Sequence, residues 1–93
     1  MTNQEKIRDL YKILVSVSSP EDCEALLDDL CTRKEVEKMA ERIYAARLLL
    51  QGKTYAQVIE EADISSATLS RISRCVQYGT GYRNALGEDG TKR

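Results

Sequence analysis

The stretch Thr54–Val76, TYAQVIEEADISSATLSRISRCV, has the pattern of two short helices joined by a tight turn. Thr54 can cap the first helix with its hydroxyl, and Gln57, three residues later, completes a capping box. The apolar side of this helix would be formed by Val58, Ile59 and Ala62. The stretch therefore predicts a helix-turn-helix, and we interpret the rest of the chain around it.

The turn between the two helices is expected at Asp63 and Ile64. A left-handed backbone is common at the first of these positions, and Asp tolerates that conformation better than most residues. We therefore expect it at Asp63, with Ile64 burying the turn against the core. Ser65 or Ser66 would then cap the second helix, since Ser is a preferred residue at that position.

The second helix of the pair has an apolar side and a polar side. Leu69, Ile72 and Val76 recur at helical spacing, which places them on one buried face. The other side would carry Ser66, Ala67, Thr68, Ser70, Arg71, Ser73 and Arg74. Small residues let a helix approach base edges, and hydroxyl and guanidinium groups bond to bases and phosphates. This composition favours a DNA-reading helix over plain scaffold, which is the alternative for any amphipathic helix pair.

Size and composition predict one small all-α domain. The 93 residues include one Pro, no Phe and no Trp, and strand-favouring runs are missing. A chain of this length buries only about 60–65% of its unfolded surface, so dimerisation is an expected source of stability. The sequence lacks both a run of roughly 18 apolar residues and the apolar centre of a signal peptide. We therefore expect a cytoplasmic protein that does not enter a membrane.

The net charge of -1 is distributed unevenly along the chain. Residues 1–32 carry three basic and seven acidic side chains, whereas residues 33–52 carry five basic and three acidic ones. The chain after residue 32 is thus mildly basic, which permits contact with phosphates without demanding it. The pI of about 5.5 favours a second class of function, a helical protein-interaction module of the same fold that does not bind DNA specifically.

Residues typical of catalytic and metal sites are scarce. The chain has no His to act as a base near neutral pH, and its five glycines are scattered rather than gathered in a phosphate-binding loop. Cys23, Cys31 and Cys75 lack the spacing of zinc ligands. We therefore expect no enzymatic activity, metal ion or built-in cofactor, and we interpret the cysteines as free thiols in a reducing compartment.

Two helices are expected within residues 1–31, which we assign to dimerisation. The first, Gln4–Ser16, is apolar on several sides and so needs more than one packing partner. It is either a core helix or an arm that packs against a second chain. The second would run from Pro20 to Cys31, with Ser19 as its cap and Pro at its first position.

A long central helix is expected over residues 32–52. Thr32 can cap it, with Glu35 completing another capping box. Gly52 can end it in a left-handed conformation.

The helix pair, which we assign to residues 54–77, is followed by a short helix expected over Tyr82–Leu86. Residues 87–93, GEDGTKR, contain no apolar residue. We therefore expect a single domain over residues 1–86 and a disordered tail after it.

Five short motifs resemble the Trp repressor superfamily, and in particular its small bacterial members of the YerC/YecD type. In chain order they are DDLCT (28–32), AAR (45–47), LLQGKTY (49–55), SSATLSR (65–71) and RCVQYG (74–79). The resemblance implies a subunit of about six helices that intertwines with a second copy through its N-terminal helices. Each subunit of the homodimer would present one helix-turn-helix to the major groove of double-stranded DNA, with half-sites about one helical turn apart.

The expected function is that of a sequence-specific DNA-binding transcription regulator, most simply a repressor. Contacts to the DNA backbone are expected near the start of the first helix of the pair. Contacts to bases are expected along the second helix, where Arg71 and Arg74 would meet bases or phosphates. The expected DNA-binding residues are Lys53, Thr54, Tyr55, Ser65, Ser66, Ala67, Thr68, Ser70, Arg71 and Arg74.

The resemblance also implies a ligand site, because the Trp repressor holds tryptophan between two arginines with the help of a threonine. Thr32, Arg42 and Arg71 stand at those positions. Guanidinium groups can stack on an aromatic ring and pair with a carboxylate, so a corepressor such as an aromatic amino acid is implied. The loop around Lys53 is one residue shorter than in the Trp repressor, and Ala56 replaces a DNA-contacting arginine. A phosphate contact or a surface ion pair is therefore the alternative for Arg42, and the effector is left open.

Overall fold

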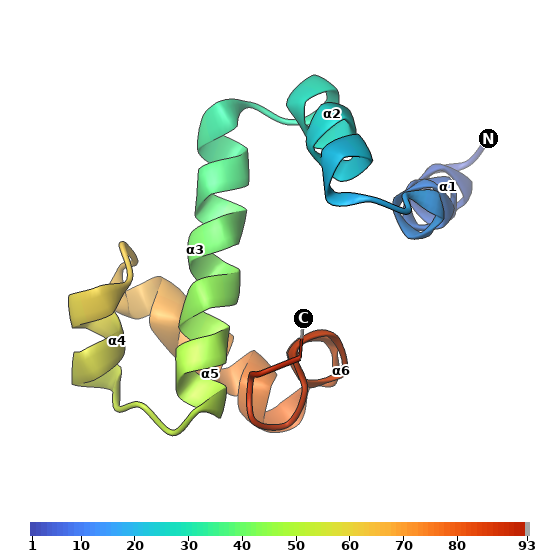
Figure 1. The fold of residues 1–93 in the computed structure, drawn as a ribbon. Coiled ribbons are helices and arrows are strands. Elements are labelled where there is room, and N and C mark those ends of the chain that lie inside the picture. Colours follow the sequence, from blue (N-terminus) through green and yellow to red (C-terminus); the bar gives the residue numbers. More distant parts are fainter. Residues whose placement is uncertain (93) are drawn as a thin grey trace. The chain divides into compact units, whose positions relative to one another are not determined.

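The computed structural model describes residues 1–92. The chain divides into two compact units, and the boundary between them lies between Val36 and Glu37 in the sequence. Regular structure in the described residues is entirely helical, so the predicted all-α class is confirmed (Figure 1). The helices are α1 (Asn3–Ser16), α2 (Pro20–Leu30), α3 (Arg33–Leu50), α4 (Tyr55–Glu61), α5 (Ser66–Tyr78) and α6 (Gly81–Leu86). None of the helices in this part of the chain is both long and apolar enough to cross a membrane.

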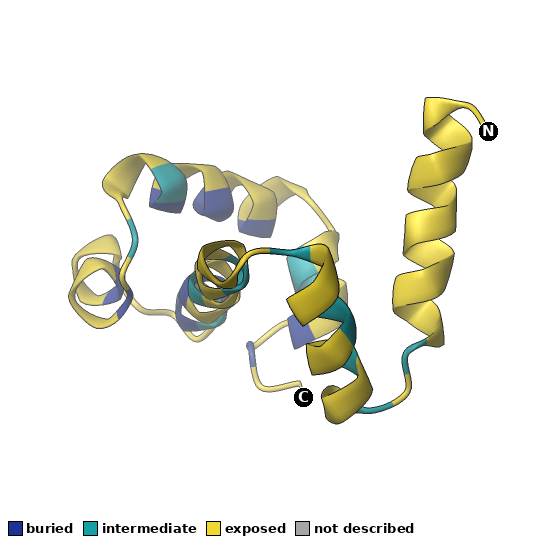
Figure 2. Cartoon of the chain, turned by 90° about the horizontal axis from the view of Figure 1, so that it is seen from above, coloured by how far each residue is buried: buried dark blue, intermediate teal, exposed yellow. Residues whose placement is uncertain are grey.

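The first unit contains α1 and α2, and neither helix has a buried residue. Figure 2 shows α1 exposed along its whole length. The exposed side chains include large apolar ones, and Val15 is 84% exposed. As predicted, Ser19 caps α2 by accepting a hydrogen bond from the Asp22 N–H (3.1 Å), and Pro20 is its first residue. Both helices therefore form through local interactions, while their apolar side chains lack a covering layer within this unit.

The capping signals predicted for α3 are present at both ends. The Thr32 hydroxyl accepts from the Glu35 N–H (3.2 Å), and the Glu35 carboxylate accepts from the Thr32 N–H (2.7 Å). Gly52 has a φ of +91°, a conformation that glycine adopts without steric cost. The N–H of Lys53 donates to the Leu48 carbonyl (3.0 Å), which closes the helix in the arrangement that such a glycine permits.

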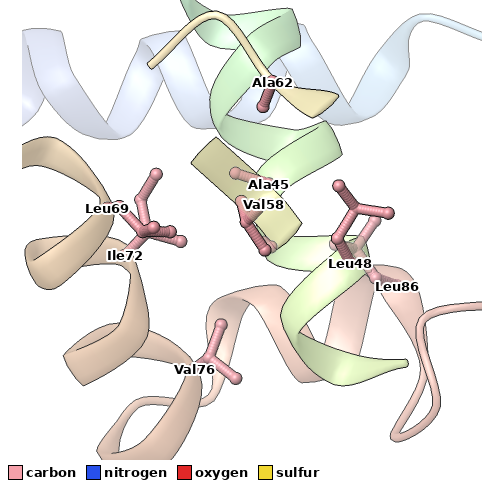
Figure 3. Close-up of a cluster of buried hydrophobic side chains, with 9 residues drawn as sticks. Ala45, Leu48, Val58, Ala62, Leu69, Ile72, Val76 and Leu86 are labelled. Atoms are coloured by element: carbon pink, nitrogen blue, oxygen red, sulfur yellow. The ribbon is translucent and has the colours of Figure 1, made fainter. Parts of the chain in front are cut away.

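The core of the second unit is built by the C-terminal half of α3 together with α4, α5 and α6 (Figure 1, Figure 3). Its buried side chains are Ala45, Ala46, Leu48, Val58, Ala62, Leu69, Ile72, Val76 and Leu86. The predicted buried face of α5 is thereby confirmed. Ile59 differs from the prediction because it is 42% exposed, so Val58 and the C-capping residue Ala62 form the buried side.

Ser73 corrects the predicted polar face of α5, because it is buried, with 7% of its surface exposed. It follows Leu69 by four residues and precedes Val76 by three, so helical geometry places it in the same stripe. The hydroxyl residue thus belongs to the core and not to the outer face of the helix.

The C-terminal segment 87–92 is hydrogen-bonded within the second unit; residue 93 lies outside the described residues, and the disorder expected for residues 87–93 stays a prediction. The Arg47 guanidinium on α3 donates to the carbonyls of Gly90 (2.7 Å) and Lys92 (2.8 Å). The Lys92 N–H donates to the Leu86 carbonyl (2.8 Å). This polar segment is therefore held through its backbone carbonyls. Amino-acid composition does not show such contacts.

Replacing Gly90 with Ala should release this segment. Gly90 has a φ of +74°, and an added Cβ would come within 2.7 Å of the Arg47 carbonyl oxygen. The left-handed conformation alone costs a non-glycine residue roughly 1–2 kcal/mol. We expect the Lys92 amide to exchange with solvent about tenfold faster or more, which NMR hydrogen exchange would measure. Gly81→Ala is the control, since a Cβ there meets no atom within 4 Å; equal exchange in the two variants would contradict the prediction.

Candidate nucleic-acid interface

The start of α4 is fixed by its own sequence. The Thr54 hydroxyl accepts from the Gln57 N–H (3.2 Å), and the Gln57 side chain accepts from the Thr54 N–H (2.9 Å). This is the predicted capping box. It sets the entry into the helix pair immediately after α3 has ended at its glycine.

The turn between α4 and α5 corrects the prediction for Asp63. No residue other than glycine has a positive φ in the described chain, so Asp63 is not left-handed. The chain instead leaves α4 in an extended conformation at Ala62, and the Ile64 N–H turns back to the Ala62 carbonyl (3.0 Å). Asp63 then donates its N–H to a carboxylate oxygen of Glu41 on α3 (3.0 Å). The Glu41 side chain on another helix therefore accepts from the Asp63 N–H, a group that would bond within α4 in a left-handed cap.

Ser65, and not Ser66, caps α5. Its hydroxyl oxygen accepts from the Thr68 N–H (3.2 Å), and the hydroxyl donates to the Thr68 Oγ1 (3.0 Å). Thr68 is half-buried, so these two residues form a local capping pair at the start of the helix. Ile64 packs partly buried against the core just before them, as predicted.

The outer face of α5 carries the remaining side chains expected to contact DNA. The exposed residues are Ser66, Ala67, Ser70, Arg71 and Arg74. Within residues 1–92, no hydrogen bond or ion pair engages the guanidinium of Arg71 or of Arg74. The helix thus presents small and hydroxyl groups near its start and two cationic groups further along, while its opposite side is held in the core.

The residues expected to meet the DNA backbone lie at the other end of α5. Lys53, Thr54 and Tyr55 are exposed at the start of α4. Lys53 and Tyr55 line a shallow cavity of about 310 Å³ together with Ser73 and Gln77 of α5. They therefore lie beside the C-terminal half of α5, whereas Ser65, Ser66 and Ala67 lie at its start.

Arg42 and Arg71, which the sequence separates by 29 positions, line one open groove of about 330 Å³. Its other lining residues are Ala67, Thr68, Ile72, Cys75 and Tyr82. Thr32 belongs to the first unit, where its hydroxyl caps α3, and its role toward a ligand stays a prediction.

Sequence reasoning did not assign Cys75 and Tyr82 to the groove. The spacing of Cys75, four residues after Arg71, could have indicated it, because residues so spaced share a helix face. Tyr82 reaches the groove only because the chain turns at Gly79 and starts α6 at Gly81, and no local pattern shows where such a turn leads.

Comparison with known proteins decides the family. Residues 5–89 match the family described as Trp repressor protein. The chain belongs to the Trp repressor family. Relatives at high coverage agree: the uncharacterized protein YerC of Bacillus subtilis (strain 168) is 37% identical over 83 residues, which span 88% of this chain and 80% of YerC. A crystal structure of a candidate Trp repressor from Staphylococcus aureus superposes with a TM-score of 0.81 at 32% identity, covering 92% of both chains.

Membership of the Trp repressor family confirms the resemblance found in the sequence motifs and the six-helix all-α fold. The family and fold are those of DNA-binding regulators rather than of enzymes. They leave the individual contact residues of this chain as predictions, because the YerC relative is itself uncharacterized.

Proposed function

We propose that this protein is a sequence-specific DNA-binding transcription regulator, acting as a homodimeric repressor through α4 and α5. The observation that supports this proposal most directly is that α5 has one buried face and one exposed polar face. One side is locked into the core by Leu69, Ile72 and Val76, and the other exposes small, hydroxyl and guanidinium groups. Such a helix can be held rigidly at a base edge, which is the arrangement that helix-turn-helix proteins use in the major groove.

The proposed contacts to bases and to the DNA backbone follow from where the residues lie on the two helices. Ser66, Ala67 and Ser70 stand near the start of α5, where helices of this motif meet base edges. Lys53 and Tyr55 stand beside the second half of α5 and would contact the DNA backbone. Thr54, Ser65 and Thr68 are engaged in capping and would contribute through the hydrogen-bonding capacity that their hydroxyls still have.

The test is binding to DNA from a random-sequence library at two salt concentrations. We expect retention of a subset of sequences, with an affinity that falls steeply as salt rises, because phosphate contacts release counterions. Absence of any retention at low salt would contradict the proposal. It would favour the alternative, a protein-interaction module. The exposed apolar side chains of α1 and the acidic side chains within residues 21–29 support that alternative.

Dimerisation is proposed from the first unit. Large apolar side chains on α1, including Ile7, Tyr11 and Ile13, are about half exposed, and neither α1 nor α2 contains a buried residue. Apolar patches of this kind mark protein–protein contacts, and a second copy of the chain is the partner that the family resemblance implies. We expect light scattering at micromolar concentration to give about twice the chain mass of 10.5 kDa. A monomer mass would contradict the intertwined arrangement.

The groove at Arg42 and Arg71 supports a small-molecule effector as part of the same proposal. Two exposed guanidinium groups near the Tyr82 ring suit a ligand with a carboxylate and an apolar body. Calorimetry with aromatic amino acids tests this hypothesis. Binding heat that is lost in Arg71→Ala would support it, and the absence of both heat and thermal shift would remove it.

A further inference from the structure

The turn between α4 and α5 depends on one hydrogen bond from outside the helix pair. The N–H groups of Ala62 and Ile64 donate to carbonyls of α4 and of the turn itself, at 2.8 and 3.0 Å. The N–H of Asp63 lies between these two groups in the sequence. It donates to Oε2 of Glu41, 22 residues earlier on α3, at 3.0 Å.

The attachment is close to the part of the protein proposed to read DNA. Only Ile64 and the capping Ser65 separate Asp63 from the first residue of α5. Ile64 packs partly buried against the core, and Glu41 accepts a hydrogen bond from the backbone of the neighbouring Asp63. The buried residues of α5 begin at Leu69. Ile64 and Glu41 therefore hold the turn and the first residues of α5, ahead of the part of the helix that packs in the core.

From this arrangement we infer that Glu41 is a positioning residue for DNA recognition. It acts through the Asp63 N–H and thereby sets the placement of Ser66, Ala67 and Ser70. The inference rests on the proposed DNA-binding function and deepens it. Recognition groups must be held within about 0.5 Å and 10–20° of the productive geometry, and a turn that loses its acceptor no longer holds them so.

The charge of Glu41 acts in the opposite direction. A carboxylate near a DNA-facing helix repels phosphates, so its removal alone should tighten binding. Lys38 and Arg42 line the same shallow hollow of about 270 Å³ and offset part of that repulsion. The positioning effect must therefore be measured between two variants that have lost the same charge.

Glu41→Gln and Glu41→Ala provide that comparison. Both are neutral, but only Gln keeps a side-chain oxygen that can accept from the Asp63 N–H. We expect Glu41→Gln to bind a DNA duplex selected by the wild-type protein at least as tightly as wild type. For each subunit that contacts the duplex, Glu41→Ala should bind about three- to tenfold more weakly than Glu41→Gln, the range expected for one hydrogen bond. Glu37→Ala, which removes an exposed carboxylate one helical turn earlier on α3, is the matched control and should not weaken binding.

Hydrogen exchange of the Asp63 amide by NMR gives an independent readout. Exchange should be faster in Glu41→Ala and close to wild type in Glu41→Gln, while the thermal midpoints of the two variants stay similar. Equal DNA affinity of the two variants, or equal exchange at Asp63, would overturn the inference while leaving the proposed function intact. If the wild-type protein binds no DNA, both the proposed function and the inference fail. Measuring DNA binding by the wild-type protein therefore distinguishes failure of the function from failure of the inference alone.

Discussion

Leu69→Ala should lower the free energy of unfolding by about 2–5 kcal/mol, the range measured for removal of a fully buried leucine. Leu69 has no exposed surface, and Figure 3 shows it beside Ile72 in the buried cluster of the second unit. The cluster that contains Leu69 also includes the small residues Ala45 and Ala46 of α3, which cannot extend to fill a space. Since small domains are stable by only about 5–15 kcal/mol in total, this single change would remove a large part of that margin.

Urea unfolding at a fixed protein concentration measures this effect, because the apparent stability of a dimer depends on concentration. Ile59→Ala is the control. It removes an apolar side chain from α4 that is already partly in water, so we expect a loss of less than about 1 kcal/mol. If Leu69→Ala lost no more stability than Ile59→Ala, the assignment of the core would be contradicted.

Features of the fold that depend on neighbouring residues could be predicted from the sequence. The capping boxes at Thr32 and Thr54 and the left-handed glycine at Gly52 were predicted correctly, because each is made by groups within about four residues of one another. The buried stripe of α5 followed from helical spacing for the same reason. Ser73 was assigned wrongly because its polarity was given more weight than its position in that stripe.

Features that join distant segments could not be predicted in this way. The N–H of Asp63 donates to Glu41, and the carbonyl of Gly90 accepts from Arg47, which is 43 residues away. No local pattern shows that these groups will meet. The pairing of Arg42 with Arg71 was expected only from the family resemblance, and the side chains that complete their groove became known from the structure.

Arg74→Ala should weaken DNA binding across all sequences and reduce its dependence on salt. Each phosphate contact contributes about 0.9 to the slope of log affinity against log salt concentration. A homodimer would lose two such contacts at once, so the slope should become shallower by close to two. Titrations of a selected duplex at several salt concentrations measure this. Lys34→Ala makes the same charge change at an exposed position at the start of α3 and should leave the slope nearly unchanged.

We expect Arg74 to contact a phosphate rather than a base because of its place on the helix. Arg74 is in the second half of α5, whereas residues near the start of such a helix reach base edges. Its neighbours Ser73 and Gln77 line the cavity that also contains Lys53 and Tyr55, the residues proposed to meet the DNA backbone. A base contact would give a different result, since Arg74→Ala would then relax the preference at a single base pair and discriminate between sequences. An unchanged salt slope together with such a local loss of preference would contradict the phosphate role. Arg74 would then contact a base, and Lys53 and Tyr55 would be left as the residues proposed to contact the DNA backbone.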